Sequence, residues 1–180
     1  MVPRPVRVCF VCSGNICRSP TAEVVLRHRA AETGRAHLVE VDSAGTGSWH
    51  AGDDMDERSR QVLADAGYDV PAHCARQFRA ADFAARDLVV ALDSGHRDAL
   101  LELAARAPDP AAARAKIVLL RDYDPDLSAG DGRDVADPYY GGREGFRAVL
   151  DQVERSCAGL LDVIARGGVA AAQQTDSADR

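Results

Sequence analysis

The chain has 180 residues, of which 46% are hydrophobic, and its 22 Lys and Arg against 28 Asp and Glu give a formal net charge of −6. This size fits one globular domain, no stretch reaches the roughly 20 apolar residues of a membrane-spanning helix, and the acidic balance argues against nucleic-acid binding. Residues 1–7 lack the apolar segment of a signal peptide, so we expect a cytoplasmic protein without membrane insertion, with export by another route left open.

Four short apolar runs are nearly continuous in hydrophobic character, as is typical of strands that are covered on both faces of a parallel sheet. They span residues 6–11, 38–41, 88–92 and 117–120. Helical patterns separate these runs. Because alternating strands and helices form right-handed βαβ units, the predicted fold is a three-layer α/β sandwich with a four-stranded parallel sheet and helices on both faces.

Capping signals locate the first two helices. The first is expected to begin at Pro20, with Ser19 as its cap, and to end at Gly34. The second is expected to follow Asp54 and Glu57, which have the spacing of a capping box.

The second half of the chain contains two more helical patterns. One begins near Ser94, and the longest, over residues 146–164, repeats apolar residues at spacings of three and four. Residues 105–115 form an Ala/Pro-rich connection. We place the domain at residues 1–166 and expect the polar, small-residue tail 167–180 to be disordered.

The segment after the first strand, residues 12–20, reads Cys-Ser-Gly-Asn-Ile-Cys-Arg-Ser-Pro. A loop between strand and helix can turn its backbone N–H groups inward at the positive end of the helix and bind a phosphate. Gly14 supplies backbone freedom, Asn15 tolerates left-handed geometry, and Arg18 offers two or more donors to an anion. These surroundings favour the thiolate, so Cys12 is a candidate nucleophile.

The five cysteines are otherwise unremarkable in pattern. We interpret Cys9, Cys74 and Cys157 as small packing residues. The pair Cys9 and Cys12 does not predict a zinc site, because a strand supplies Cys9 and no second Cys/His pair has ligand spacing. We therefore expect no metal.

Attack by a thiolate expels an alkoxide or phenoxide, which needs a proton donor. The turn-rich residues 134–142 precede the last helix and supply Asp137, which we choose because Pro138 stiffens the loop. The residues alone do not separate Asp137 from Asp134 or Asp124.

Residues 11–23, together with residues 137–141, closely resemble the low-molecular-weight protein tyrosine phosphatases of bacteria, and the resemblance extends over about residues 6–164. It implies a flavodoxin-like fold and a reaction through a phosphocysteine, with no cofactor. Cys12 would be the nucleophile, Arg18 would bind the phosphoryl group, and Asp137 would be the general acid and later the base that activates water.

The resemblance also implies supporting roles around this centre. The phosphate-binding loop would comprise Ser13, Gly14, Asn15, Ile16, Cys17 and Ser19. Loop support would come from Ser43 and His73, and Trp49, Tyr139 and Tyr140 would wall a slot as deep as a phenol ring. Cys17 could also close a reversible disulfide with Cys12 that protects the nucleophile from over-oxidation.

The implied partners are tyrosine-phosphorylated proteins and a cognate tyrosine kinase, and the protein would be a monomer or weak dimer. Two alternative functions are a thiol-dependent arsenate reductase and a catalytically weak phosphotyrosine-binding adaptor. The first needs closely spaced downstream cysteines, whereas only Cys74 lies in the middle of the chain. The second needs neither the thiol of Cys12 nor the carboxyl of Asp137.

Overall fold

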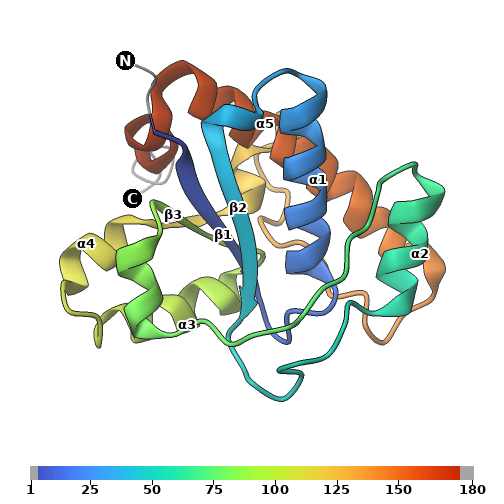
Figure 1. Ribbon diagram of the computed structural model, residues 1–180, viewed down its shortest axis with the longest axis horizontal. Coiled ribbons are helices and arrows are strands. Elements are labelled where there is room, and N and C mark those ends of the chain that lie inside the picture. The colour runs from blue at the N-terminus through green and yellow to red at the C-terminus, as the bar shows by residue number, and fades with distance from the viewer. Residues whose placement is uncertain (1–3, 175–180) are drawn as a thin grey trace.

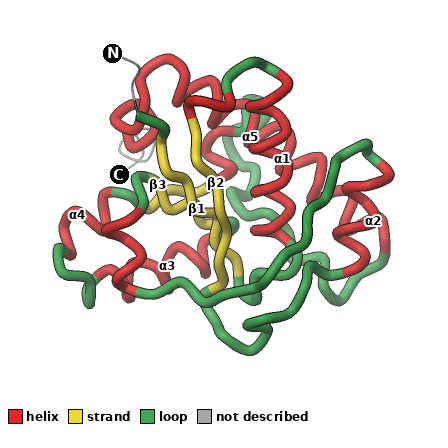
Figure 2. Tube along the Cα trace, viewed as in Figure 1, coloured by secondary structure: helices red, strands yellow, loops and turns green. Residues whose placement is uncertain are grey.

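Four parallel strands form the centre of the computed structural model, which describes residues 4–174, and they lie in the order β2-β1-β3-β4 (Figures 1 and 2). The strands are β1 (Val6–Cys12), β2 (Val39–Gly45), β3 (Leu88–Ala91) and β4 (Ile117–Leu119). The helices are α1 (Arg18–Glu32), α2 (Glu57–Asp65), α3 (Ser94–Ala104), α4 (Pro110–Ala115) and α5 (Arg143–Gln174). The predicted parallel α/β architecture is therefore confirmed.

Helices cover both faces of the sheet: α1 and α5 pack on one face with α2 beside them, and α3 and α4 lie on the other (Figure 1). Side chains of β1 alternate between the layers. Val8 and Phe10 belong to the core under α1 and α5, and Cys9 and Val11 belong to the core under α3 and α4. All four are fully buried, which explains the continuous apolar run of this strand.

The strand order reverses at β1, which pairs with β2 on one side and with β3 on the other. In sheets of this type, ligands bind beyond the carboxyl ends of the strands at such a reversal. The strand β1 ends at Cys12, so the fold places this thiol at the position where a ligand site is expected.

The first helix begins two residues earlier than predicted, at Arg18, and its N-cap is Cys17. Ser19 is not the cap, because its hydroxyl faces inward and contacts Cys12 and Asn15. The helix starts here because the backbone of the loop after Cys12 turns directly into it.

The second helix begins at Glu57, where the carboxylate of Asp56, rather than of Asp54, accepts the backbone N–H of Arg58. Asp54 instead accepts the N–H groups of Met55 and His73. Its side chain therefore stabilises the approach to the helix and the neighbouring loop, not the helix end.

The C-terminal part of the chain differs from the prediction. Within the connection 105–115, residues Pro110–Ala115 form a short helix capped by Asp109. The predicted boundary at residue 166 falls inside α5, which continues to Gln174. The hydroxyl of Tyr123 donates a hydrogen bond to the carbonyl of Ala172, whose methyl group is buried, so the last turns dock on the core. Residues 175–180 of the predicted tail lie outside the described residues.

No helix within residues 4–174 is both long and apolar enough to cross a membrane.

The docking of the last helical turns predicts a measurable contribution to stability. Tyr123→Phe removes the hydroxyl that reaches Ala172 and should lower the free energy of unfolding by about 1 kcal/mol, because one buried hydrogen bond is lost. Urea unfolding measures this change. Tyr140→Phe is the matched control, since its ring is 93% exposed. Equal stability of both variants and wild type would contradict the docking.

Candidate active site

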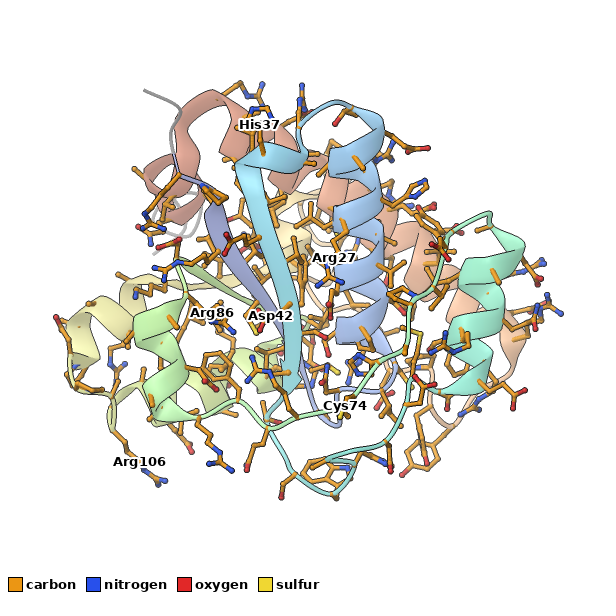
Figure 3. All side chains as sticks on the ribbon, in the orientation of Figure 1. Arg27, His37, Asp42, Cys74, Arg86 and Arg106 are labelled. Carbon is orange, nitrogen blue, oxygen red and sulfur yellow. The ribbon has the colours of Figure 1, made fainter. Side chains whose placement is uncertain are left out.

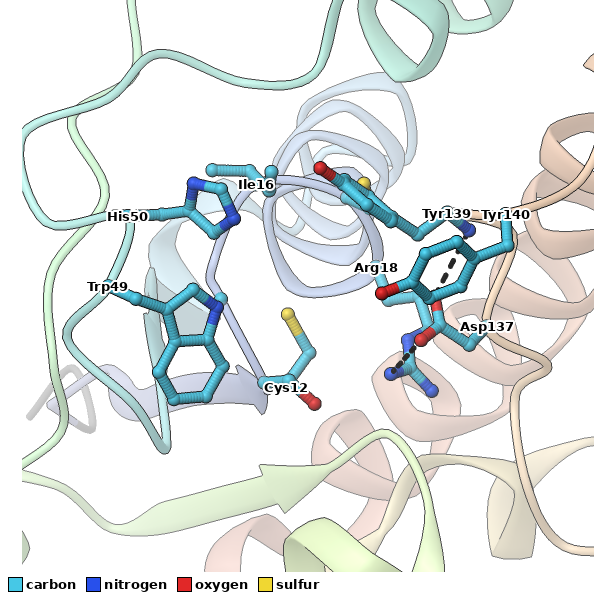
Figure 4. Close-up of a pocket in the computed structure, with 11 residues that line it drawn as sticks. Cys12, Ile16, Arg18, Trp49, His50, Asp137, Tyr139 and Tyr140 are labelled. Atoms are coloured by element: carbon cyan, nitrogen blue, oxygen red, sulfur yellow. Dashed lines mark hydrogen bonds and ion pairs between the residues drawn. The ribbon is translucent and has the colours of Figure 1, made fainter.

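A pocket of about 300 Å³ opens at the carboxyl end of β1 (Figure 4). Three separate segments line it. Their pocket-lining residues are Cys12, Ser13, Gly14, Ile16, Cys17 and Arg18 from the first, Trp49 and His50 from the second, and Asp137, Tyr139 and Tyr140 from the third. The structure thus brings the predicted catalytic and slot residues together, and it adds His50. The predicted support residues Ser43 and His73 do not line the pocket, and both hydrogen-bond to Asn15 of the loop.

Asn15 occupies the turn of the phosphate loop with a φ of 58°, a left-handed conformation that Asn adopts more readily than most residues. Its side-chain amide donates to the hydroxyls of Ser19 and Ser43, at 2.9 Å each, and its oxygen accepts the backbone N–H of Arg76 at 3.0 Å. The ring of His73 donates to the Asn15 carbonyl at 2.7 Å. The buried Asn15 side chain is thus fixed from three directions, and these contacts stabilise the strained turn.

Two glycines allow the loop to fit against its neighbours. A Cβ on Gly45 would lie 2.6 Å from the carbonyl oxygen of Ser13, so the end of β2 can carry no side chain here. A Cβ on Gly14 would lie 2.8 Å from the ring of His50. Gly14 therefore makes room for a pocket wall, while the left-handed residue is Asn15. Gly45 and Arg76 are support residues to which the sequence analysis gave no role.

The Cys12 sulfur lies 2.9 Å from the Ser19 hydroxyl oxygen. That oxygen accepts a hydrogen bond from Asn15 and lies 3.2 Å from the carbonyl of Ala44. A hydroxyl carries one proton, which can turn from the carbonyl to the sulfur when Cys12 ionises. Ser19 can therefore stabilise a thiolate, because its acceptor side is already occupied by the Asn15 amide.

Arg18 is the first residue of α1, and its guanidinium is almost fully buried. It donates to the Asp93 carboxylate at 2.8 Å and to the Val135 carbonyl at 3.0 Å. Asp93 also caps α3 by accepting the N–H of His96, so its position is fixed. These contacts orient the guanidinium toward the pocket, where it can bind two oxygens of an anion.

His96 is a buried residue behind the phosphate loop that the sequence analysis did not identify. Its Nε2 lies 2.8 Å from the Ser13 hydroxyl and 3.4 Å from a nitrogen of Arg18. Because arginine can only donate, Nε2 is the acceptor, and the proton sits on Nδ1. Nδ1 is 3.0 Å from the Asp93 carboxylate, though not aligned for a hydrogen bond.

Burial and the adjacent Arg18 charge lower the pKa of His96 to about 4, against opposing effects of Asp93, Asp137 and Asp134. The ring is therefore neutral at physiological pH. A neutral acceptor at this position avoids placing a second cation beside Arg18.

Asp137 is the one of the three candidate acids that lines the pocket. Its side chain is half exposed, and its carboxylate accepts the N–H of Tyr139 at 3.1 Å and lies 3.6 Å from Arg18. Asp134 instead accepts from the N–H and hydroxyl of Ser94. Asp124 is buried: burial would raise its pKa, but hydrogen bonds from Arg155 and the charge of nearby arginines hold it below the usual range. Asp137 alone of these three can reach a bound substrate.

Aromatic side chains stand on two sides of the pocket, with Cys12 between them (Figure 4). Trp49 and His50 form one wall, and Tyr139 and Tyr140 form the other. The rings of the two tyrosines meet edge to face, with their centroids 5.0 Å apart. The ring of His50 is held by Asp53, which accepts from Nδ1 at 3.0 Å. Two exposed aromatic walls above a buried thiol suit a flat ring that carries a phosphate.

The remaining cysteines separate into two groups. Cys9 and Cys157 are buried, and burial raises the pKa of both thiols. Cys74 is exposed on the loop after α2 (Figure 3), so the interpretation as a packing residue was wrong for this cysteine. The Cys9 sulfur lies 3.8 Å from a guanidinium nitrogen of Arg76. Asp42 pairs with Arg76 and with Arg86, and Figure 3 shows Asp42 and Arg86 side by side at the strand β2. Within residues 4–174, no three His, Cys, Asp or Glu side chains gather in a way that could hold a metal ion.

The fold and the site together define a class of protein. A parallel α/β sheet of flavodoxin-like order carries, at its point of strand reversal, a phosphate-binding loop with a buried thiol at its first position and an arginine at the following helix start. A cysteine at an anion-binding loop is the arrangement of enzymes that act on phosphate esters through sulfur.

Comparisons with known proteins identify the family. The family model of the low molecular weight phosphotyrosine protein phosphatases matches residues 7–170. A low molecular weight protein-tyrosine-phosphatase of Streptomyces coelicolor is 55% identical over 158 residues, which cover 88% of this chain and 93% of that protein. A protein tyrosine phosphatase from Entamoeba histolytica aligns with a TM-score of 0.81 and 34% identity over 90% of this chain and 98% of that one. An arginine phosphatase of Drosophila aligns with a TM-score of 0.77 and 34% identity over 86% and 95%.

The chain therefore belongs to the low molecular weight protein tyrosine phosphatase family, and it is a hydrolase whose substrates are phosphotyrosine-containing proteins. The fold class and the family that the sequence predicts are confirmed.

The low pKa of His96 predicts how stability depends on pH. Between about pH 6.5 and 4 the unfolded chain binds a proton at this residue that the folded protein does not, so stability falls as pH decreases through this range. Wild type should thus lose more stability than His96→Gln when the pH is lowered from about 7 to about 5. Urea unfolding at both pH values measures the difference, and parallel losses in the two proteins would contradict it.

Proposed function

We propose that hydrolysis proceeds through a phosphocysteine on Cys12, with Arg18 binding the phosphoryl group and Asp137 acting as general acid and then as base. The observation that carries this proposal is the convergence of these three side chains, from two segments more than 100 residues apart in the chain, on one pocket. Asp137 lies 3.6 Å from Arg18, so the acid stands beside the group that would hold the phosphate.

In the first step the Cys12 thiolate attacks phosphorus, and the bond from phosphorus to the tyrosine oxygen breaks. Arg18 and the loop N–H groups neutralise the charge on the other phosphate oxygens. Asp137 gives its proton to the departing phenoxide, which leaves as tyrosine. The Ser19 hydroxyl, 2.9 Å from the sulfur, stabilises the thiolate before attack.

In the second step a water molecule attacks the phosphocysteine. Asp137, now a carboxylate, accepts a proton from this water, the bond from sulfur to phosphorus breaks, and inorganic phosphate leaves. Asp137 can serve both steps because it stands at the open side of the pocket, opposite the thiol, and retains access to solvent.

The depth of the pocket supports selectivity for phosphotyrosine. The thiol of Cys12 is buried, whereas Trp49 is 66% and Tyr140 is 93% exposed. A substrate that brings its phosphate to the sulfur and also contacts these walls needs a spacer between the two, which the ring of tyrosine supplies. Phosphoserine has a shorter side chain and would leave the aromatic walls without contact.

Phosphate release from peptides of one sequence that contain phosphotyrosine, phosphoserine or phosphoarginine tests the proposal, with chelator and reductant present. We expect selective hydrolysis of phosphotyrosine, its loss in Cys12→Ser, and a decrease of about 10²-fold or more in Asp137→Ala. Asp134→Ala is the matched control, since its carboxylate binds Ser94 outside the pocket. Preferred hydrolysis of phosphoarginine would overturn the assigned substrate, and an active Cys12→Ser enzyme would overturn the mechanism.

We also propose that Cys17 protects Cys12 from over-oxidation. Both thiols line the same pocket. Burial and the charge of Asp56 raise the pKa of Cys17 to about 12, against a hydrogen bond from Ser59, so Cys17 is a neutral thiol. Peroxide would thus oxidise Cys12 first, to a sulfenic acid, and the thiol of Cys17 would then displace water from it to form a disulfide.

Peroxide treatment followed by peptide mapping tests this protection. We expect a peptide that links Cys12 to Cys17, together with activity that dithiothreitol restores. In Cys17→Ser, activity should be lost irreversibly, whereas Cys74→Ser, which changes an exposed cysteine, should behave as wild type. Recovery of Cys12 only as sulfinic or sulfonic acid in wild type would exclude the disulfide.

The proposal extends to partners and location. We propose that a cognate tyrosine kinase supplies the phosphorylated substrates, and that the protein acts as a monomer or weak dimer in the cytoplasm. All five cysteines are free thiols, which is typical of proteins in a reducing compartment.

A further inference from the structure

The general acid lies on residues 135–141, which we call the acid loop. The two ends of this loop are held by different contacts. At its start, Val135 is buried, its N–H donates to the carbonyl of Leu92 at 2.8 Å, and its carbonyl accepts from Arg18. Beyond it, Asp137 and Tyr140 are exposed, and a turn closes from the N–H of Gly141 to the carbonyl of Pro138. The position of Asp137 therefore depends on what holds the second half of the loop.

Arg58, near the start of α2, contacts this second half. Its guanidinium donates to the carbonyl of Tyr139 at 3.0 Å and lies 3.5 Å from that of Gly141. It also lies over the Tyr139 ring at 5.5 Å and over the Phe146 ring at 4.5 Å. The N–H of the same Tyr139 donates to Asp137, so a single residue connects Arg58 to the general acid.

Asp56 fixes Arg58 on the other side. Its carboxylate accepts three hydrogen bonds from Arg58: from Nε at 3.0 Å, from a terminal nitrogen at 2.9 Å and from the backbone N–H. These bonds lower the pKa of Asp56, although burial opposes them, so the pair stays ionised. The N–H of Asp56 in turn donates to the carbonyl of Ile16 in the phosphate loop at 2.8 Å.

Continuous contacts thus lead from the phosphate loop through Asp56 and Arg58 to Tyr139 and Asp137. An ordinary surface ion pair contributes little, because its side chains are mobile. The Arg58 guanidinium differs because it is planar, bonds a carboxylate with two nitrogens, bonds a carbonyl with the third and lies against two aromatic rings. Lysine cannot reproduce this set of contacts.

We propose that Arg58 is a positioning residue that holds the acid loop against the phosphate loop, so that Asp137 reaches the oxygen of the leaving group. Arg58 does not line the pocket and touches no reacting atom. This inference rests on the proposed role of Asp137, since Arg58 acts through that residue.

The test compares kcat/KM for two substrates on the same enzyme preparation. Phenyl phosphate releases a phenol with a pKa of about 10 and needs protonation by Asp137, whereas the nitro group of p-nitrophenyl phosphate stabilises the phenoxide and reduces this need. Arg58→Ala should lower kcat/KM for phenyl phosphate about tenfold more than for p-nitrophenyl phosphate. The ratio of the two values is independent of the fraction of folded enzyme.

Two variants serve as references. Arg58→Lys keeps the charge and should recover only part of the ratio. Arg35→Ala removes an arginine that pairs with Asp162 at 2.6 Å. Neither residue lines the pocket, so this variant should match wild type. An equal loss for both substrates in Arg58→Ala, or full recovery by lysine, would overturn the proposal.

The double variant Arg58→Ala with Asp137→Ala separates this inference from the role of Asp137. If Arg58 acts through Asp137, its loss should change the ratio less than twofold once Asp137 is absent. An undiminished effect of Arg58→Ala in that background would overturn the positioning role. If Asp137→Ala itself leaves the ratio unchanged, the assignment of the general acid fails, whatever the behaviour of Arg58.

Discussion

The side-chain amide of Asn15 is the interaction on which the site depends. It holds a left-handed turn in place by donating to Ser19 and Ser43 and accepting from the backbone of Arg76. Without these bonds, a non-glycine residue in this conformation would favour a different backbone, and the inward N–H groups of the loop would be lost. The same amide sets the direction of the Ser19 hydroxyl, because it occupies the acceptor side of that oxygen. The shape of the anion site and the environment of the thiol therefore share one cause.

A second constraint is the burial of the Arg18 guanidinium. A buried cation is costly unless charges and hydrogen bonds compensate it, and Asp93 and the carbonyl of Val135 supply them here. His96 completes this arrangement as a neutral acceptor. Because Val135 begins the acid loop, the residue that would bind the phosphate also fixes one end of the segment that carries Asp137.

The sequence predicted the strands and their parallel arrangement well, because short apolar runs that alternate with helical patterns are typical of buried strands in a parallel sheet. Helix starts were less predictable. Serine is a strong capping residue, yet the geometry of the loop directs Ser19 inward. The segment 167–174 is rich in small residues and was interpreted as disordered, but alanine is also a strong helix former, and the bond from Tyr123 to Ala172 stabilises the last turns.

The pocket residues were predictable only where a local pattern or the family resemblance marked them. Asp93 matches the family but received no role, and His96 was missed, because their partners, Arg18 and Ser13, are about 80 positions away along the chain. One signal could have given Asp93 a role: it is a carboxylate that follows a buried strand whose end meets the same edge of the sheet as Cys12. Arg76 and Gly45 also match the family, but no local pattern gave them a role, since their roles depend on backbone atoms that only the folded chain brings near.

The two sides of the pocket are built on different foundations. Cys12 and Arg18 continue directly into β1 and α1, which form the core, whereas the wall of Tyr139 and Tyr140 is attached through exposed side chains. A substitution near the thiol therefore risks the whole fold, while one at Tyr140, whose side chain is 93% exposed, alters the contact with the substrate and leaves the core unchanged. Such a division allows a lineage to change which phosphorylated partners it accepts while the reacting centre and the folding stability stay intact.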